Sequence, residues 1–203
     1  TALADGVAQA LGAELLIGAV YDRDYFCGEQ IDEVLSKLKK SLKFAHVHRR
    51  KEIENYLILP AVLDRVIARG VAERRTKGLS AGIPTESAED ILMEVANELK
   101  DDVEQQYVSR YSDYHQKQSK KDLSTLLKEA TNLFRTRWKE PDHRWALVSG
   151  KEAMRRFREK IQTSLGLSIT DAKIVDAMRQ EDFSDDLIEL LEGLERFRQL
   201  KVA

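Results

Sequence analysis

Two aspartates, Asp22 and Asp24, follow a near-continuous apolar run at residues 15–21. Such a run is typical of a buried parallel strand. Residues i and i+2 of an extended backbone point the same way, so both carboxylates could bind one cation. Mg²⁺ prefers these hard oxygen ligands, and phosphoryl transfer uses such an ion to neutralise charge. The pattern favours a metal site over the alternative, a solvated turn after a strand.

Two glutamates, Glu52 and Glu54, belong to the second candidate segment, residues 49–57. This segment follows residues 44–48, which predict another short strand. An i, i+2 pair diverges on a helix, so the two glutamates point together only where the backbone is extended or turning. In that geometry they could bind a second ion beside the first. Surface pairing with the three basic residues before them is equally consistent with the sequence.

The elements that would position these acids form a βαβ unit. Apolar residues recur with helical period over residues 29–42, between the two predicted strands. A helical crossover makes the two strands parallel neighbours. Ligands of parallel sheets bind beyond the carboxyl ends of the strands, where Asp22, Asp24 and the segment after His48 would meet.

Helices are expected through most of the remaining chain. Residues 3–12 show helical spacing before the first strand, and Pro60 suits the first turn of a helix that ends near residue 75. A long helix is expected over residues 87–115. The later helices are expected to begin at N-caps. These N-caps are Asp122, Ser149, Thr170 and Ser184.

The motifs together resemble the Toprim nuclease region of the OLD (overcoming lysogenization defect) family of ATPase-nucleases. The resemblance spans about residues 13–197. Its specific segments are Tyr-Asp-Arg-Asp-Tyr at residues 21–25, His-Val-His at 46–48, Arg-Lys-Glu-Ile-Glu-Asn-Tyr-Leu at 50–57 and Ser-Gly-Lys-Glu at 149–152.

The resemblance implies two-metal cleavage or nicking of DNA with Mg²⁺ or Mn²⁺, within an ATP-regulated phage-defence or repair protein. It implies that Asp22 and Asp24 bind one metal, that Glu52 and Glu54 bind or position the second, and that Lys151 contacts the scissile phosphate. A Lys in the first turn of a helix also adds charge to free N–H groups that attract anions. The alternative for Lys151 is an exposed surface lysine.

The sequence also departs from the family pattern. Toprim sites use a Glu on an earlier strand, and no residue here matches it. Residues 149–152 lack the glycine and hydroxyl residue of a P-loop, so this chain holds no ATPase site. We therefore expect a piece of a longer protein, with an N-terminal ATPase domain as its partner.

Composition limits the class of protein. With 42% hydrophobic and 33% charged residues, the 203-residue chain is expected to fold around a real core. A net charge of -2 excludes DNA binding through bulk positive charge, so DNA contacts must come from local clusters. A single cysteine and the lack of any long apolar run predict a cytoplasmic protein without a membrane partner.

Other residue groups are weaker candidates. His46 and His48 could bind zinc together with His115 or His143, although a histidine pair on a strand is more often structural. Bases and aromatics alternate over residues 107–121 and could follow a nucleic-acid strand, but a half-packed helix face is the preferred interpretation.

The predicted fold is α/β and predominantly helical, with a partial Toprim (Rossmann-like) parallel sheet and an appended helical domain. Residues 1–58 form the partial Toprim segment, residues 59–140 a helical domain, and residues 141–203 a helical segment that returns Lys151 to the nuclease site. The alternative function is a non-catalytic DNA-binding or dimerisation module, in which the C-terminal amphipathic helices could form a homodimer contact.

Overall fold

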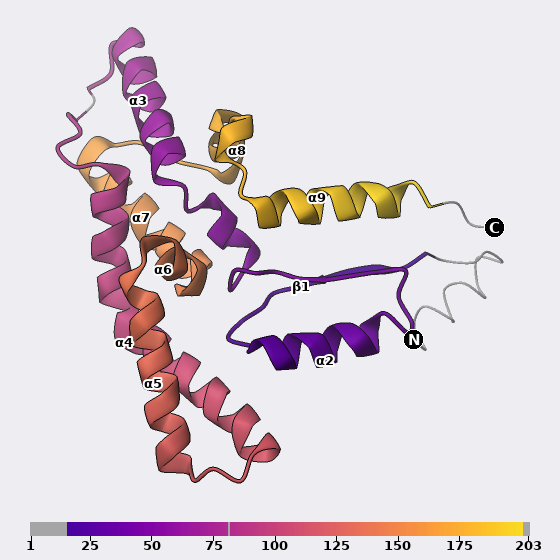
Figure 1. Cartoon of the computed structure of the whole chain (residues 1–203). Helices are drawn as coiled ribbons and strands as arrows, with labels where there is room; N and C mark the ends of the chain where they lie inside the picture. Colours follow the sequence, from indigo (N-terminus) through magenta and orange to yellow (C-terminus); the bar gives the residue numbers. More distant parts are fainter. Residues whose placement is uncertain (1–15, 81, 201–203) are drawn as a thin grey trace, which may run out of the picture.

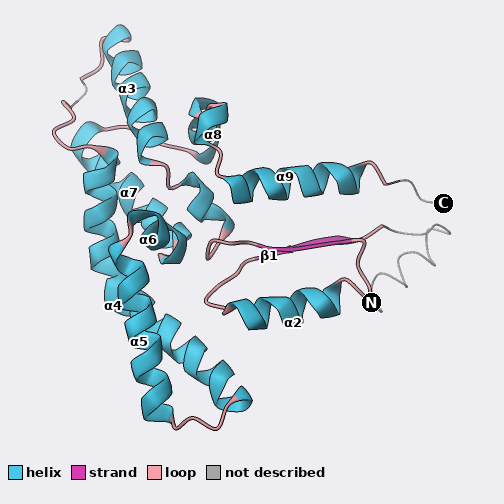
Figure 2. Cartoon of the chain, in the orientation of Figure 1, coloured by secondary structure: helices cyan, strands magenta, loops and turns pink. Residues whose placement is uncertain are grey.

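The computed structural model describes residues 16–80 and 82–200 (Figure 1). Figure 2 shows a predominantly helical chain with one small sheet, which confirms the α/β class at this coarse level. The helix expected at residues 3–12 and the first residue of the expected strand 15–21 lie outside the described residues. No helix within the described ranges is both long and apolar enough to span a bilayer.

The sheet and two helices form a unit that we call the α/β arm. Strands β1 (Gly18–Tyr21) and β2 (Phe44–Val47) are parallel, with Gly18 opposite Phe44, as the βαβ pattern predicted. Helix α2 (Gly28–Leu38) connects them, and α9 (Asp185–Arg198) packs on β2. In Figure 1 these two helices lie on opposite sides of the strands. The last helix of the chain thus completes a unit that begins near its N-terminus.

The remaining helices form the helical body. Its long helix α4 packs against α3, α5 and α7. Fully buried Phe134 and Phe157 belong to its core. The helices of the body are α3 (Pro60–Thr76), α4 (Ala88–Gln118), α5 (Leu123–Lys139), α6 (Pro141–Leu147), α7 (Gly150–Leu165) and α8 (Asp171–Ala177). The short 3-10 helices η1 (Ile53–Leu57) and η2 (Gln180–Asp182) connect the body to the arm.

Local capping explains where most of these helices begin. Asp122 accepts a hydrogen bond from the Thr125 amide at 3.0 Å, and Ser149 and Thr170 cap α7 and α8 in the same way. Pro60 lies in the first turn of α3. These predictions are confirmed. Ser184 occupies the N-cap position of α9, but its side chain accepts no capping hydrogen bond.

Several boundaries differ from the sequence prediction. Helix α2 ends at Leu38 rather than at residue 42, because the amides of Lys40 and Ser41 donate to carbonyls only three residues back, those of Lys37 and Leu38. Helix α4 continues to Gln118. Pro141 ends α5 as expected, and it also begins α6, since a proline suits the first turn of a helix.

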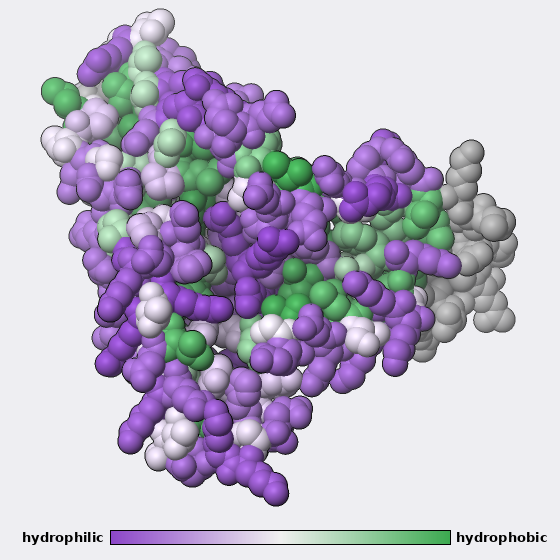
Figure 3. Space-filling view, viewed as in Figure 1, coloured by the Kyte–Doolittle hydropathy of each residue, from purple (hydrophilic) through white to green (hydrophobic). Residues whose placement is uncertain are grey.

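The arm buries little of its apolar surface. None of the residues of α2, all of which the structure describes, is buried. On β1, Val20 is 40% exposed and Tyr21 46% exposed. Figure 3 accordingly shows hydrophobic side chains at the surface around the strands, between α2 and α9.

Candidate functional site

The loop that follows β2 is held by the buried side chain of Asn55. The Asn55 Nδ2 donates to the carbonyls of Trp145 at 2.7 Å and Val148 at 2.8 Å, and its Oδ1 accepts from the Glu52 amide at 2.8 Å. Asn55 is fully buried, so these bonds are shielded from water. Asn55 therefore fixes η1 against the segment that enters α7.

Glu52 lies at the N-terminus of α7. Its carboxylate accepts hydrogen bonds from Lys51 Nζ, from Ser149 Oγ at 3.4 Å and from the Lys151 amide at 3.1 Å. Burial alone would raise the pKa of Glu52, but the bonds from Lys51 and the Lys151 amide outweigh it and lower that pKa. The N–H groups of this helix end were expected to be free for a phosphate. For the Lys151 amide that expectation is wrong, because Glu52 is already the anion there.

Glu54 and Lys151 face each other where η1 meets the start of α7. We call this place the junction. The Lys151 Nζ lies 3.8 Å from Glu54 Oε1, and the lysine side chain is 65% exposed. The second oxygen, Glu54 Oε2, is buried without a hydrogen-bond partner among the described residues. The exposed Lys151 ammonium can thus meet an anion from solvent while it faces Glu54.

Asp22 joins the junction from the end of β1. Its Oδ1 accepts from the Ile53 amide at 3.2 Å and lies 3.9 Å from Nε2 of buried His48. Burial, together with the charge of His46, lowers the pKa of His48 and keeps its imidazole neutral near pH 7. Asp22 is thus set between a backbone donor and a neutral imidazole.

Asp24 reaches the junction through a turn. Its amide donates to the Lys51 carbonyl at 3.0 Å, and its φ of 48° lies in the left-handed region. The turn closes with the bond from the Phe26 amide to the Arg23 carbonyl. The expectation that residues 22–24 are extended is therefore wrong, and strand alternation does not orient these two carboxylates. Asp tolerates this backbone conformation better than most residues do.

The structure brings all five predicted site residues to one junction without forming a tight acidic cluster. Asp22, Asp24, Glu52 and Glu54 do not provide three ligand atoms within 4.8 Å of one another, and in the described ranges the group that does so is Cys27, Glu29 and His115. The proposed zinc site at His46 and His48 is likewise not assembled in the described part of the chain.

Basic side chains line a pocket together with Asp24. This pocket of about 220 Å³ opens beside Asp24, between the arm and the body. Its basic or imidazole-bearing lining residues are Arg23, Arg49, Arg137 and His143. Arg23 also donates to the Arg49 carbonyl at 2.9 Å, which ties the turn to the loop after β2. This pocket offers positive charge to an anionic ligand next to the acids.

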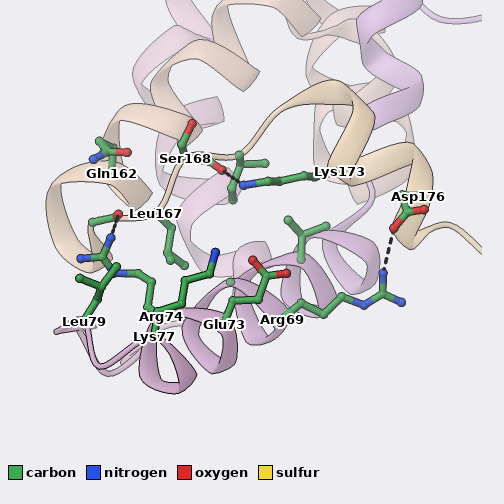
Figure 4. A pocket seen from close by; sticks show the side chains of 14 residues that line it. Arg69, Glu73, Arg74, Lys77, Leu79, Gln162, Leu167, Ser168, Lys173 and Asp176 are labelled. Atoms are coloured by element: carbon green, nitrogen blue, oxygen red, sulfur yellow. Dashed lines mark hydrogen bonds and ion pairs between the residues drawn. The ribbon is translucent and has the colours of Figure 1, made fainter.

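A larger pocket of about 370 Å³ lies away from the acids, between α3 and the segment from α7 to α8 (Figure 4). Most of its charges already have partners. Arg69 lies 3.5 Å from Asp176, Arg74 donates to the Gly166 carbonyl, and Lys173 donates to the Ser168 carbonyl. The first two contacts connect α3 to α8 and to the end of α7, and the three together account for most of the charged lining by packing.

Sequence reasoning missed the residues that hold the site together. Asn55 appeared only as part of a motif, although its spacing of three residues from Glu52 is that of a capping pair. The partners of Asn55 lie 90 and 93 residues away, so no local pattern reveals them. Comparison with family models, with curated proteins and with solved structures found no match.

Proposed function

We propose that the chain is a metal-dependent DNA endonuclease or nickase with a two-metal Toprim-type site, and that it works within an ATPase-coupled protein of the OLD type. One observation carries the proposal. The ends of two parallel strands and the start of α7, more than 90 residues apart in sequence, meet at one junction that contains Asp22, Asp24, Glu52, Glu54 and Lys151.

The donor set fits Mg²⁺ or Mn²⁺. Asp22 and Asp24 are exposed carboxylates, and Glu54 has an orphaned buried oxygen. All three offer the hard oxygen ligands that these ions prefer. Glu52 is already engaged by Lys51, Ser149 and the Lys151 amide, so we assign it the role of positioning the start of α7.

The ion and the other residues of the junction then each have a chemical role. A bound divalent ion would neutralise the phosphodiester and orient the attacking group. Lys151, whose backbone is fixed by Glu52, places an ammonium where charge develops on the phosphate. Neutral His48 accepts or passes a proton beside Asp22. The basic pocket beside Asp24 binds the neighbouring phosphates of the DNA.

The test is nicking of supercoiled plasmid by the intact protein that contains this chain, with Mn²⁺ or Mg²⁺. We expect Asp24→Asn and Lys151→Ala each to lose on the order of 10²-fold in rate, the loss typical of removing a group that stabilises a transition state. Asp32→Asn and Lys40→Ala, exposed and remote from the junction, serve as matched controls. Equal nicking by wild type and Asp24→Asn, or no nicking with either ion, would contradict the proposal.

A second candidate is a non-catalytic DNA-binding module. The engagement of Glu52 and the absence of a tight acidic cluster among the described residues favour it. Such a module would retain DNA equally well in chelator, whereas the metal-dependent site predicts weaker retention. A gel-shift titration with and without chelator separates the two candidates.

A further inference from the structure

A second group of metal-binding side chains lies where α2 meets the end of α4. Cys27 is the N-cap residue of α2, Glu29 is in its first turn, and His115 is in the last turn of α4. One ligand atom from each lies within 4.8 Å of the others. We propose that Cys27, Glu29 and His115 bind a transition-metal ion, with Zn²⁺ as the preferred ion and a fourth position open to water or another ligand.

The chemistry of the three ligands selects the ion. A thiolate and an imidazole are the ligands that Zn²⁺ favours, and a carboxylate commonly completes its tetrahedral set. Mg²⁺ and Ca²⁺ prefer oxygen ligands alone and so are disfavoured by Cys27. Three protein ligands with an open position distinguish this site from closed structural sites with four. Binding replaces the thiol proton by the ion and releases that proton to solvent.

Neighbouring side chains hold the group in place before any ion binds. The ring of His115 packs against Tyr111, with centroids 4.1 Å apart, and against Tyr114 at 5.2 Å. The Tyr114 hydroxyl donates to Glu33 Oε1 at 2.9 Å, which ties the end of α4 to α2. This packing fixes the orientation of the His115 ring.

The site would connect the two parts of the molecule. Cys27 and Glu29 belong to the α/β arm and His115 to the helical body, so one ion would link α2 to α4. Ligands that bind only the folded chain raise its stability, and Zn²⁺ should therefore raise the melting temperature. The inference is independent of the proposed nuclease site, because the two sites share no ligand and select different ions.

The test is titration of the chain with Co²⁺, a spectroscopic substitute for Zn²⁺. Wild type should bind one Co²⁺ with a thiolate-to-Co²⁺ charge-transfer band, and one equivalent of Zn²⁺ should abolish that band while excess Mg²⁺ leaves it unchanged. Cys27→Ser should lose the band. His115→Ala and Glu29→Gln should weaken Co²⁺ binding by more than the roughly 10- to 100-fold that loss of a supporting group costs.

Matched variants control for general effects. Lys40→Ala and Asp32→Asn, exposed and outside the group, should bind Co²⁺ as wild type does. Circular dichroism of the metal-free variants checks that each is folded, and exposed Glu29 is the substitution least able to disturb the fold. A wild-type chain without the charge-transfer band, or His115→Ala and Glu29→Gln variants with unchanged affinity, would overturn the proposal.

Discussion

The helical body and the α/β arm differ in how they are stabilised. Every long helix of the body buries several apolar side chains, including fully buried Phe134 and Phe157. In the arm, α2 buries none of its residues, and α9 buries only Leu190 and Gly193. Asp22 and Asp24 lie on the arm, Glu52 and Glu54 lie on the connection at η1, and Lys151 lies on the body. The body thus provides stability, and the candidate site lies where the weakly buried arm joins it.

The junction between the two parts compensates for the thin core of the arm. Polar contacts dominate there, through Asn55, Glu52 and the Tyr56 hydroxyl, which donates to Asp186 Oδ2 at 2.8 Å. Buried polar contacts are directional, whereas apolar packing tolerates small shifts. We infer that the geometry of the candidate site depends on a few hydrogen bonds at the junction and not on burial of the arm.

The largest loss of stability is expected from a cavity in the core of the body. Phe157→Ala should lower the free energy of unfolding by about 3–5 kcal/mol, the usual cost of a large buried cavity. Ile31→Ala on α2 should cost less than about 1.5 kcal/mol, because its side chain is only partly buried. Urea denaturation of both variants measures the difference. Equal losses would show that the arm is as tightly packed as the body.

Removal of the junction amide should have the next largest effect. Asn55→Ala leaves the Glu52 amide and the Trp145 and Val148 carbonyls without their partner, and each stranded buried group costs about 1–3 kcal/mol. We therefore expect a loss of at least about 2 kcal/mol in urea denaturation. Asn132→Ala, exposed on α5, is the matched control and should change stability little. If Asn55→Ala left the stability unchanged, the hydrogen bonds of Asn55 would not hold the junction together.

A methyl group tests how closely the junction is packed. In Gly150→Ala the new Cβ would lie 2.6 Å from the Asn55 backbone nitrogen, so the chain must shift at a cost of about 1–3 kcal/mol. Gly28→Ala at the start of α2 meets no atom within 4 Å and should be neutral or slightly stabilising. Thermal unfolding compares the pair. A Gly150→Ala variant as stable as Gly28→Ala would mean that the two segments are not in close contact.

The smallest effect concerns pH. Burial lowers the pKa of both His46 and His48, so the unfolded chain takes up these protons at a higher pH than the folded chain. Stability should therefore be unaffected above the ordinary histidine pKa of about 6.5 and should fall as the pH drops below it. His48→Gln should reduce this loss between pH 7 and pH 5 in urea denaturation. An identical pH profile in the variant would exclude His48 as its source.

Much of the secondary structure and the location of the candidate site could be predicted from the sequence. Capping residues such as Asp122 and Ser149 accept hydrogen bonds from amides three residues away. Apolar periodicity predicts which face of a helix is buried over a few turns. The two parallel strands followed from the helix between them. These features depend on neighbours in the chain, so the sequence alone determines them.

Only the tertiary structure decided which distant groups meet. It placed Glu52 on the Lys151 amide, turned Asp24 into a left-handed conformation, packed α9 on β2 and brought His115 to Cys27. Apart from the turn at Asp24, each of these contacts joins residues that are distant in the sequence, so no local pattern relates them. The packing of whole helices brings them together. A hydrogen bond between residues 90 or more positions apart leaves no periodic pattern in the chain, so the order of strands and helices was predictable while these partners were not.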